Sequence, residues 1–326
     1  MAIQTRNGKA FEYALAQAFY DKLRTSTNSS FLENDAFFVA KEKYNLFNEE
    51  DKDSYKLHSN FAVNLIIDLE PRLKASINSS DKLILEIASD SRGQEGDVRD
   101  LIIIRSEQNW EIGISAKNNH RALKHSRLSG RLDFGNVWLN TPCSVQYFNE
   151  ITPIFDKLKD IKKSDPNTKW DVFSSKDDEV YYPILEAFKR EINVLEKSKG
   201  DEFASELILY LVGNKDFYKV IKSKTKTEIQ AFNLTGSLNQ GLGKIKPIAK
   251  ISKLNLPSKI LDISYKKNKL NTLIMTFDEG WQISFRIHSA SSRVEASLKF
   301  DINLISAPHT LFSNHVIVKI KNSGYV

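Results

Sequence analysis

The chain has 326 residues, 41% of them hydrophobic and 27% charged, which suits a soluble protein of one large domain or two ordinary ones. Its single cysteine, Cys143, excludes an intramolecular disulfide and a four-cysteine zinc site, so a reducing cytoplasm is the expected setting. The N-terminus lacks the apolar run of a signal peptide, and no run approaches the roughly 20 residues that span a bilayer.

Charge is distributed unevenly along the chain. Residues 215–326 hold 18 Lys/Arg against 7 Asp/Glu, a net charge of +11, whereas residues 1–214 hold 29 against 34, a net charge of −5. A basic C-terminal third beside an acidic remainder predicts a polyanion-binding surface joined to a carboxylate-rich site. Lysines that only solvate a β-rich surface would give the same count, so charge alone leaves both interpretations open.

The N-terminal part is predicted to be mostly helical. Apolar residues recur at three- and four-residue spacing over about Lys9–Leu23, which predicts a helix with one buried stripe. Asn7-Gly8 suits the turn before this helix, and Glu12 in its first turn would complement the helix dipole. The other segments expected here are a loop at 25–35, helices at 36–47 and 58–73, a turn at 78–81 and a polar loop at 89–95.

The stretch 96–119 is predicted to form two strands joined by a short turn. Four apolar residues at 101–104 suit a strand that is buried on both faces, residues 106–109 form a polar turn, and 110–116 return as the second strand. A third short strand is expected at 83–88.

Asp100 opens the first of the two strands and Lys117 ends the second, so the two side chains should meet at one edge of the sheet. Alternation along a strand places Ser115 and Lys117 on the same face. A carboxylate, backbone carbonyls and an ammonium group that converge there can hold a divalent cation and activate a water molecule. An ordinary exposed hairpin carries the same pattern, so the spacing by itself does not decide.

The remaining chain shifts from helix to strand. The run NNHRALKHSRLS is predicted to be a short helix, and 130–141 a loop anchored by Phe134 and Trp138. Further helices are expected at 145–162, 179–197 and 203–211, and strands at 217–222, 229–234, 259–265, 272–277, 282–288 and 295–304, with the turn Asp278-Glu279-Gly280 as a strong hairpin signal. This shift and the charge change predict a nuclease core at 1–205, with catalytic strands at 83–117, and a β-rich basic DNA-recognition region at 206–326.

The layout resembles the PD-(D/E)XK nuclease superfamily, with Glu12 on an N-terminal helix, Asp100 at a strand start and Ser115-Ala116-Lys117 at a strand end. The blocks GQEGDVRDLII, ISAKNNHRALKHSRLS and SFRIHSASSRVEASLKFDI further resemble the HaeIII family of type II restriction endonucleases over nearly the whole chain. This resemblance implies an α/β (α+β) fold with a mixed central sheet flanked by helices. It also implies metal-dependent cleavage of duplex DNA at the palindrome GGCC, with Mg²⁺ as the cofactor, in a restriction-modification system.

Carried over by position, Asp100 and the Ala116 carbonyl would bind the metal ion, and Lys117 would orient or deprotonate the attacking water. The chain departs from the superfamily pattern at Ser115, where a second acid is usual and a hydroxyl is a poor ligand for Mg²⁺. The missing charge could come from Glu12, Asp97 or Glu86, and Glu12 is favoured. Asp97 also competes with Asp100 for the main role, but the apolar strand begins directly after Asp100.

DNA contacts are expected from the segment after Lys117 and from the C-terminal region. Arginine and lysine suit phosphates and guanine, and asparagine or glutamine suits adenine. The candidates are Asn118, Asn119, Arg121, Lys124, His125, Arg127, Gln282, Arg286 and Arg293. His120 and His125 are five positions apart, a poor spacing for one shared metal ion.

Two other functions remain open at this point: a repair or junction-cutting nuclease of the same fold, and a non-catalytic DNA-binding protein. No Walker A pattern or dinucleotide-binding glycine fingerprint is present, so a nucleotide cofactor is not expected. The sequence does not distinguish a monomer from a homodimer.

Overall fold

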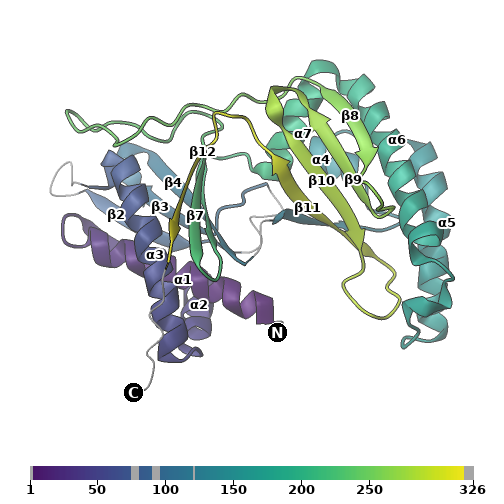
Figure 1. Cartoon of the computed structure of the whole chain (residues 1–326), viewed down its shortest axis with the longest axis horizontal. Coiled ribbons are helices and arrows are strands. Elements are labelled where there is room, and N and C mark those ends of the chain that lie inside the picture. Colours follow the sequence, from purple (N-terminus) through teal and green to yellow (C-terminus); the bar gives the residue numbers. More distant parts are fainter. Residues whose placement is uncertain (1–2, 75–80, 90–95, 120–121, 319–326) are drawn as a thin grey trace. The chain divides into compact units, whose positions relative to one another are not determined.

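The computed structural model describes residues 3–74, 81–89, 96–119 and 122–318. The chain forms two compact units whose segments alternate along the sequence (Figure 1). Unit 1 contains Met1–Arg121, Gly213–Leu254 and Thr310–Val326, and unit 2 contains Ala122–Val212 and Asn255–His309. The compact units therefore differ from a single division after residue 205, because 213–254 returns to unit 1.

Unit 1 is built on a mixed seven-stranded sheet. In spatial order its strands are β1 (Asn28–Leu32), β2 (Lys82–Ile87), β3 (Leu101–Arg105), β4 (Trp110–Asn118), β6 (Phe217–Lys222), β7 (Lys226–Phe232) and β12 (Phe312–Ile317). The pairs β1–β2 and β4–β6 are parallel and the other pairs are antiparallel. The predicted hairpin is confirmed, since β3 and β4 are joined by the short 3₁₀ turn Ser106–Gln108.

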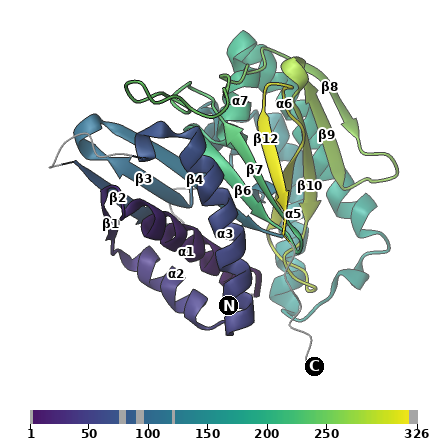
Figure 2. The same cartoon turned by 60° about the vertical axis from the view of Figure 1, so that its left-hand side comes forward.

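Three helices cover one face of this sheet, as Figure 2 shows for strands β1 to β4. They are α1 (Ile3–Leu23), α2 (Asp35–Asn45) and α3 (Glu49–Leu69). Alternate residues of the central strands, such as Leu101 and Ile103 of β3 and Ile112 and Ile114 of β4, are fully buried against the helices. Their neighbours in sequence face the opposite side of the sheet, and this alternation decides which side chains are available at the sheet edge.

The predicted helices of this part are confirmed in existence, but α1 and α3 begin earlier than the sequence indicated, at Ile3 and Glu49, and α3 ends at Leu69 rather than at 73. Asn7-Gly8 lies inside α1, and Glu12 is nine residues past its start. A helix dipole acts mainly on the first turn, so the predicted dipole role of Glu12 is wrong. The predicted loop at 25–35 is wrong in part, because residues 28–32 form β1 and pair with the distant strand β2. The turn at 78–81 and the loop at 89–95 fall largely outside the described residues.

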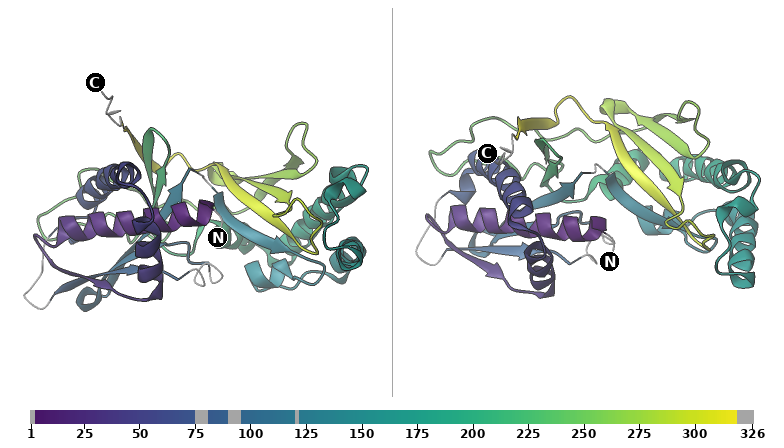
Figure 3. Two further views of the ribbon diagram at one scale, coloured as in Figure 1. Left: turned by 90° about the horizontal axis from the view of Figure 1, so that it is seen from below. Right: turned by 60° about the horizontal axis from the view of Figure 1, so that its bottom comes forward.

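Unit 2 is built on an antiparallel five-stranded sheet. In spatial order its strands are β5 (Ala122–Leu128), β11 (Leu298–Ser306), β10 (Gln282–His288), β9 (Thr272–Phe277) and β8 (Ile260–Tyr265). The helices of the unit are α4 (Phe134–Leu139), α5 (Val145–Ser164), α6 (Tyr182–Lys199) and α7 (Phe203–Val212). Phe188 of α6 packs on Phe285 and Phe300, so one sheet face is covered by helices, and α5 and α6 lie to one side of the green and yellow strands in Figure 3.

Two predictions in this unit are wrong. The run after Asn119 is not a helix but strand β5, whose burial alternates along the strand and whose partner is β11, about 170 residues away. The expected loop at 130–141 contains helix α4, which is capped by Asp133. The turn between β9 and β10 is confirmed, with Glu279 in the left-handed region at φ 56°. Among the described residues, none of the helices is long and apolar enough to cross a membrane.

Gly113 of β4 is the position where a side chain would be least tolerated. A Cβ atom there would lie 1.9 Å from Cδ of Arg99, a side chain only 6% exposed. Gly113→Ala should therefore lower the free energy of unfolding by about 1–3 kcal/mol, the usual cost of overpacking. Gly8→Ala is the matched control, because it lies within α1 with no atom within 4 Å of the added methyl group. It should raise stability by about 0.5–1 kcal/mol, and denaturant unfolding that ranked the two variants the other way would contradict this packing.

Candidate active site

Backbone hydrogen bonds on both sides fix Asp100 at the mouth of β3. Its N–H donates to the carbonyl of Ile114 in β4 at 2.8 Å, and its carbonyl accepts from the N–H of Ala88, directly after β2, at 3.0 Å. The residue therefore extends the sheet ladder by one position although the strand itself begins at Leu101. Its side chain is held at the sheet edge by two neighbouring strands.

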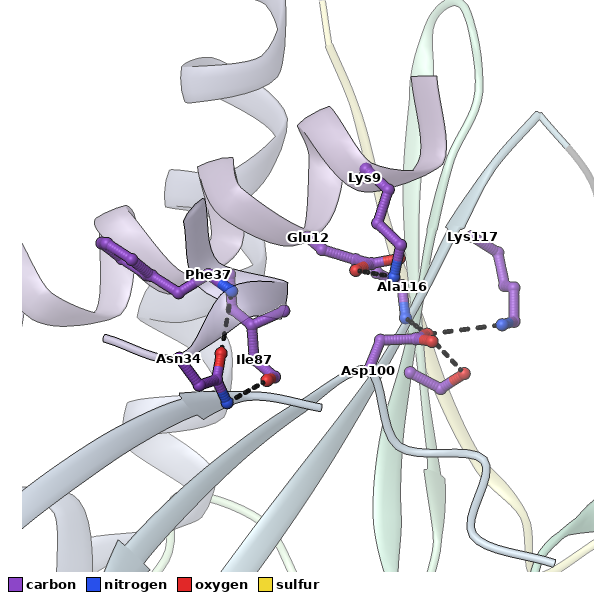
Figure 4. Close-up of polar contacts among 9 residues, drawn as sticks. Lys9, Glu12, Asn34, Phe37, Ile87, Asp100, Ala116 and Lys117 are labelled. Atoms are coloured by element: carbon purple, nitrogen blue, oxygen red, sulfur yellow. Dashed lines mark hydrogen bonds and ion pairs between the residues drawn. The ribbon is translucent and has the colours of Figure 1, made fainter. Parts of the chain in front are cut away.

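The Asp100 carboxylate accepts hydrogen bonds from three consecutive residues of β4 (Figure 4). The backbone N–H of Ala116 donates to Oδ2 at 2.6 Å, the Ser115 hydroxyl at 3.3 Å and Lys117 Nζ at 3.4 Å. The predicted meeting of Asp100 and Lys117 is confirmed. All three contacts fall on Oδ2, and none of the residues that the structure describes donates to Oδ1.

Glu12 lies beside this group, on the helix that covers the sheet. Its Oε2 accepts from Lys9 Nζ at 2.9 Å, and the residue is 7% exposed. Burial and, to a smaller extent, the negative charge of Asp100 raise the pKa of Glu12, while the charges of Lys9 and Lys117 lower it, and the net result is a pKa of about 7. Two carboxylates repel each other when both are ionised, and burial strengthens this repulsion. A bound cation would relieve it.

The residues present fit a divalent oxygen-liganded metal ion. Asp100 and Glu12 offer carboxylate oxygens, and the Ala116 carbonyl points to the β3 side because its own N–H does. In 3–74, 81–89, 96–119 and 122–318 no group of three or more Asp, Glu, His or Cys side chains could hold a metal ion. Two carboxylates are nevertheless typical of Mg²⁺, which keeps several water molecules and takes further oxygens from a substrate phosphate.

The competing acid Asp97 forms an ion pair with Arg99. Its carboxylate accepts from Arg99 Nε at 2.8 Å and from Arg99 Nη2 at 2.7 Å, and Glu111 binds the other end of the same guanidinium. Glu86 lies in β2 opposite Ile102 of β3. Glu12 is electrostatically linked to the site, because the charges of Asp100 and Lys117 both shift its pKa.

Two DNA-contact candidates of unit 1 lie at the end of β4. Asn118 Nδ2 donates to the Tyr55 hydroxyl at 3.4 Å, and its Oδ1 is buried without a hydrogen bond from any described residue. Asn119 is exposed in the left-handed region at φ 58°, and its N–H donates to the carbonyl of Lys222. His120 and Arg121 lie outside the described residues.

The unit 2 candidates separate into two groups. His125 and Arg127 of β5 and Arg286 of β10 are exposed on the sheet face away from the helices, where Gln282 also lies. Lys124 faces the helices instead: its Nζ is 3.4 Å from the centre of the Tyr210 ring, and burial lowers the pKa of Lys124 to about 8.

Arg293 lies outside the strands of this sheet, in a bridge to Lys169.

Two residues of interest were missed by the sequence interpretation. Lys9 pairs with Glu12, and the signal was present in their three-residue spacing on one helix. Asp301 of β11 contacts both His125 and Arg286, and no local signal could have shown this because the three residues lie on separate strands.

Comparisons with known proteins identify the family of the chain. The family model described as HaeIII restriction endonuclease matches residues 8–308. A type II restriction enzyme, HaeIII from Haemophilus aegyptius, is 41% identical over 311 residues, which cover 94% of this chain and 95% of that protein. A comparison with solved structures gave no match. The chain belongs to the HaeIII restriction endonuclease family.

Proposed function

We propose that this protein is a type II restriction endonuclease that hydrolyses phosphodiester bonds of duplex DNA at the palindrome GGCC, with Mg²⁺ as cofactor, in the cytoplasm. The observation that carries the proposal is the meeting of Glu12, Asp100 and Lys117 at one sheet edge in a chain of this family. Type II restriction endonucleases generally depend on a divalent metal, and the oxygen ligands here suit Mg²⁺.

Each residue has a separate task in this proposal. Asp100 and Glu12 hold the cation through their carboxylates, and Ser115, whose side chain is 1% exposed, helps to fix the Asp100 carboxylate. The cation, when bound, polarises the scissile phosphate and acidifies a water molecule for in-line attack. Lys117 Nζ, held 3.4 Å from Asp100, orients the attacking water or takes its proton and faces the charge that develops on the phosphate.

DNA contacts outside the catalytic group remain part of the proposal. The net charge of +11 over residues 215–326 supports phosphate binding by this basic region, which is the proposed recognition part of the chain. Asn118 and Asn119 directly follow Lys117 in the chain, and this adjacency supports their proposed contact with the strand being cut. The length of the footprint on DNA tests whether one chain or a homodimer binds the palindrome.

The proposal is tested by digesting a plasmid of known sequence with the purified protein and mapping the ends. We expect discrete fragments whose ends all fall at GGCC, formed with Mg²⁺ and absent with a chelator. A uniform smear would indicate a nuclease of the same fold without sequence preference, and discrete ends at another sequence would correct the site. An absence of cleavage, with binding retained, would indicate a non-catalytic DNA-binding protein.

A further inference from the structure

The open face of the unit 2 sheet carries a row of three charged or titratable side chains. His125 of β5, Asp301 of β11 and Arg286 of β10 are direct partners across three neighbouring strands. Arg286 Nη2 donates to Asp301 Oδ2 at 3.0 Å, and His125 Nδ1 lies 3.7 Å from Asp301 Oδ1. The inward neighbours Phe285 and Phe300 are fully buried, so alternation directs the row away from the helices.

Exposure shows that this row is not there mainly for stability. The side chains of Arg286 and His125 are 53% and 55% exposed and that of Asp301 is 18% exposed, and an ion pair whose cation is this open to solvent contributes little to folding. Arg286 retains most of its N–H donors for another partner, since a guanidinium has five and the described bond to Asp301 uses one.

A carboxylate in the middle of the row points to bases rather than to phosphates. The next row along the same strands pairs Arg127 with Lys299, which are two cations that suit phosphate oxygens. Asp301 would repel a phosphate, so a surface built only to bind the DNA backbone has no use for it. A carboxylate does suit the amino group of cytosine, and an arginine suits O6 and N7 of guanine.

We infer that Asp301 and Arg286 together read one G·C base pair in the major groove, with Arg286 donating to guanine and Asp301 accepting from cytosine. The row of three strands spans about 10 Å, which is within the groove width of about 12 Å. Their mutual hydrogen bond fixes both groups before DNA binds. This inference rests on the proposed function, because it assigns the recognition of one pair within the site that is cut.

The test measures kcat/KM on a set of short duplexes: one with GGCC and four in which the outer or the inner G·C pair is replaced by A·T or by T·A. Because the palindrome is symmetric, the two outer pairs are equivalent to each other, and so are the two inner pairs. For Arg286→Ala we expect a loss of about 5- to 150-fold on GGCC. At one kind of position, either outer or inner, the variant should no longer distinguish G·C from A·T, while it still rejects replacements at the other kind. Asp301→Ala should lose discrimination at the same position.

Two further variants separate the alternatives. Arg286→Lys keeps the charge but not the two-pronged donor, so it should lose discrimination like the alanine variant, whereas a phosphate contact would survive. Arg190→Ala is the matched control, since this arginine of α6 is 52% exposed and paired with Glu150, and it should behave as wild type.

Each remaining outcome counts against the inference. An equal loss on every duplex would show that Arg286 binds a phosphate, and unchanged rates would show that the row only faces solvent. Either result refutes the inference alone if the wild-type protein cuts at GGCC. A wild-type protein without sequence preference would refute the proposed function, and the inference with it.

Discussion

Lys117→Ala is expected to slow DNA cleavage by about 10²- to 10⁴-fold, the usual contribution of a positioned proton donor or acceptor. The lysine lies at the end of β4 with Nζ 3.4 Å from Asp100, so its removal takes away the one cation in direct contact with that carboxylate among the described residues. The loss should fall on the rate constant of the chemical step, measured by single-turnover cleavage of a duplex that contains the site. DNA binding and the thermal melt should change little, because the described contact of Lys117 Nζ with Asp100 is 3.4 Å long, which exceeds the usual length of a strong charge-assisted hydrogen bond.

Lys74→Ala is the matched control for this variant. Lys74 also belongs to unit 1 and also pairs with an aspartate, Asp68 of α3, at 2.8 Å, and its described ion pair involves neither Asp100 nor Lys117. It should cleave at the wild-type rate. Full activity in a folded Lys117→Ala protein would refute the assignment of the site.

Lys117→Arg distinguishes the two tasks proposed for the lysine. Arginine keeps the positive charge but cannot release its proton at any pH at which the protein is folded. If Lys117 accepts a proton from water, the arginine variant should be as slow as the alanine variant. Substantial activity with arginine would assign Lys117 to orientation and charge only.

Glu12→Gln is expected to raise the Mg²⁺ concentration needed for half-maximal cleavage and to lower the maximal rate. Glu12 supplies the second carboxylate that Ser115 cannot, and a neutral amide binds the ion more weakly. In the wild-type protein the pKa of Glu12 is raised to about 7, so the carboxyl ionises as the pH rises through 7. Activity at limiting Mg²⁺ should therefore increase between pH 6 and pH 8, and this increase should be smaller in the variant.

The same substitution should stabilise the metal-free protein at high pH. In the unfolded chain the carboxyl ionises near its ordinary pKa of 4.5, whereas in the folded chain it keeps its proton to about 7. The wild-type protein therefore loses stability as the pH rises from 4.5 through 7, by about 3 kcal/mol at most. Glutamine removes this loss, so the variant should gain on wild type between pH 5 and pH 8 in denaturant unfolding with a chelator.

Glu111→Gln is the control for both measurements. Glu111 lies on β4 as Lys117 does, but at the other end of the strand, and it pairs with Arg99 at 2.7 Å. Its replacement should leave the Mg²⁺ requirement unchanged. An unaltered Mg²⁺ requirement in Glu12→Gln itself would transfer the second ligand to Asp97 or Glu86, and an unaltered pH dependence of unfolding would contradict the burial of the charge.

The sequence by itself determined the parts of the site that are close in the chain. Asp100 and Lys117 belong to one hairpin, so strand alternation and a short turn were enough to predict that they meet. The turn at Asp278-Glu279-Gly280 was predicted for the same reason, and the long helices α5 and α6 followed from periodicity. Local signals suffice where the partner is a few residues away.

Only the tertiary structure decided the elements whose partners are distant. Strand β1 forms because it pairs with β2, which lies about 50 residues away in the chain, and β5 forms because it pairs with β11. The sequence had predicted a loop for the first segment and a helix for the second. A short segment with few apolar residues has no strong preference of its own, and the hydrogen bonds of a remote strand then select its conformation.

The same reason applies to the functional groups. Resemblance to the nuclease superfamily suggested Glu12, but its position in the helix was misjudged, and the structure provided the burial and the nearby charge of Asp100 that raise its pKa. Asp301 had no signal in the sequence, because its meaning depends on the register of β5, β11 and β10. Register fixes which side chains share a sheet face, and it is set by hydrogen bonds between segments that the linear sequence does not connect.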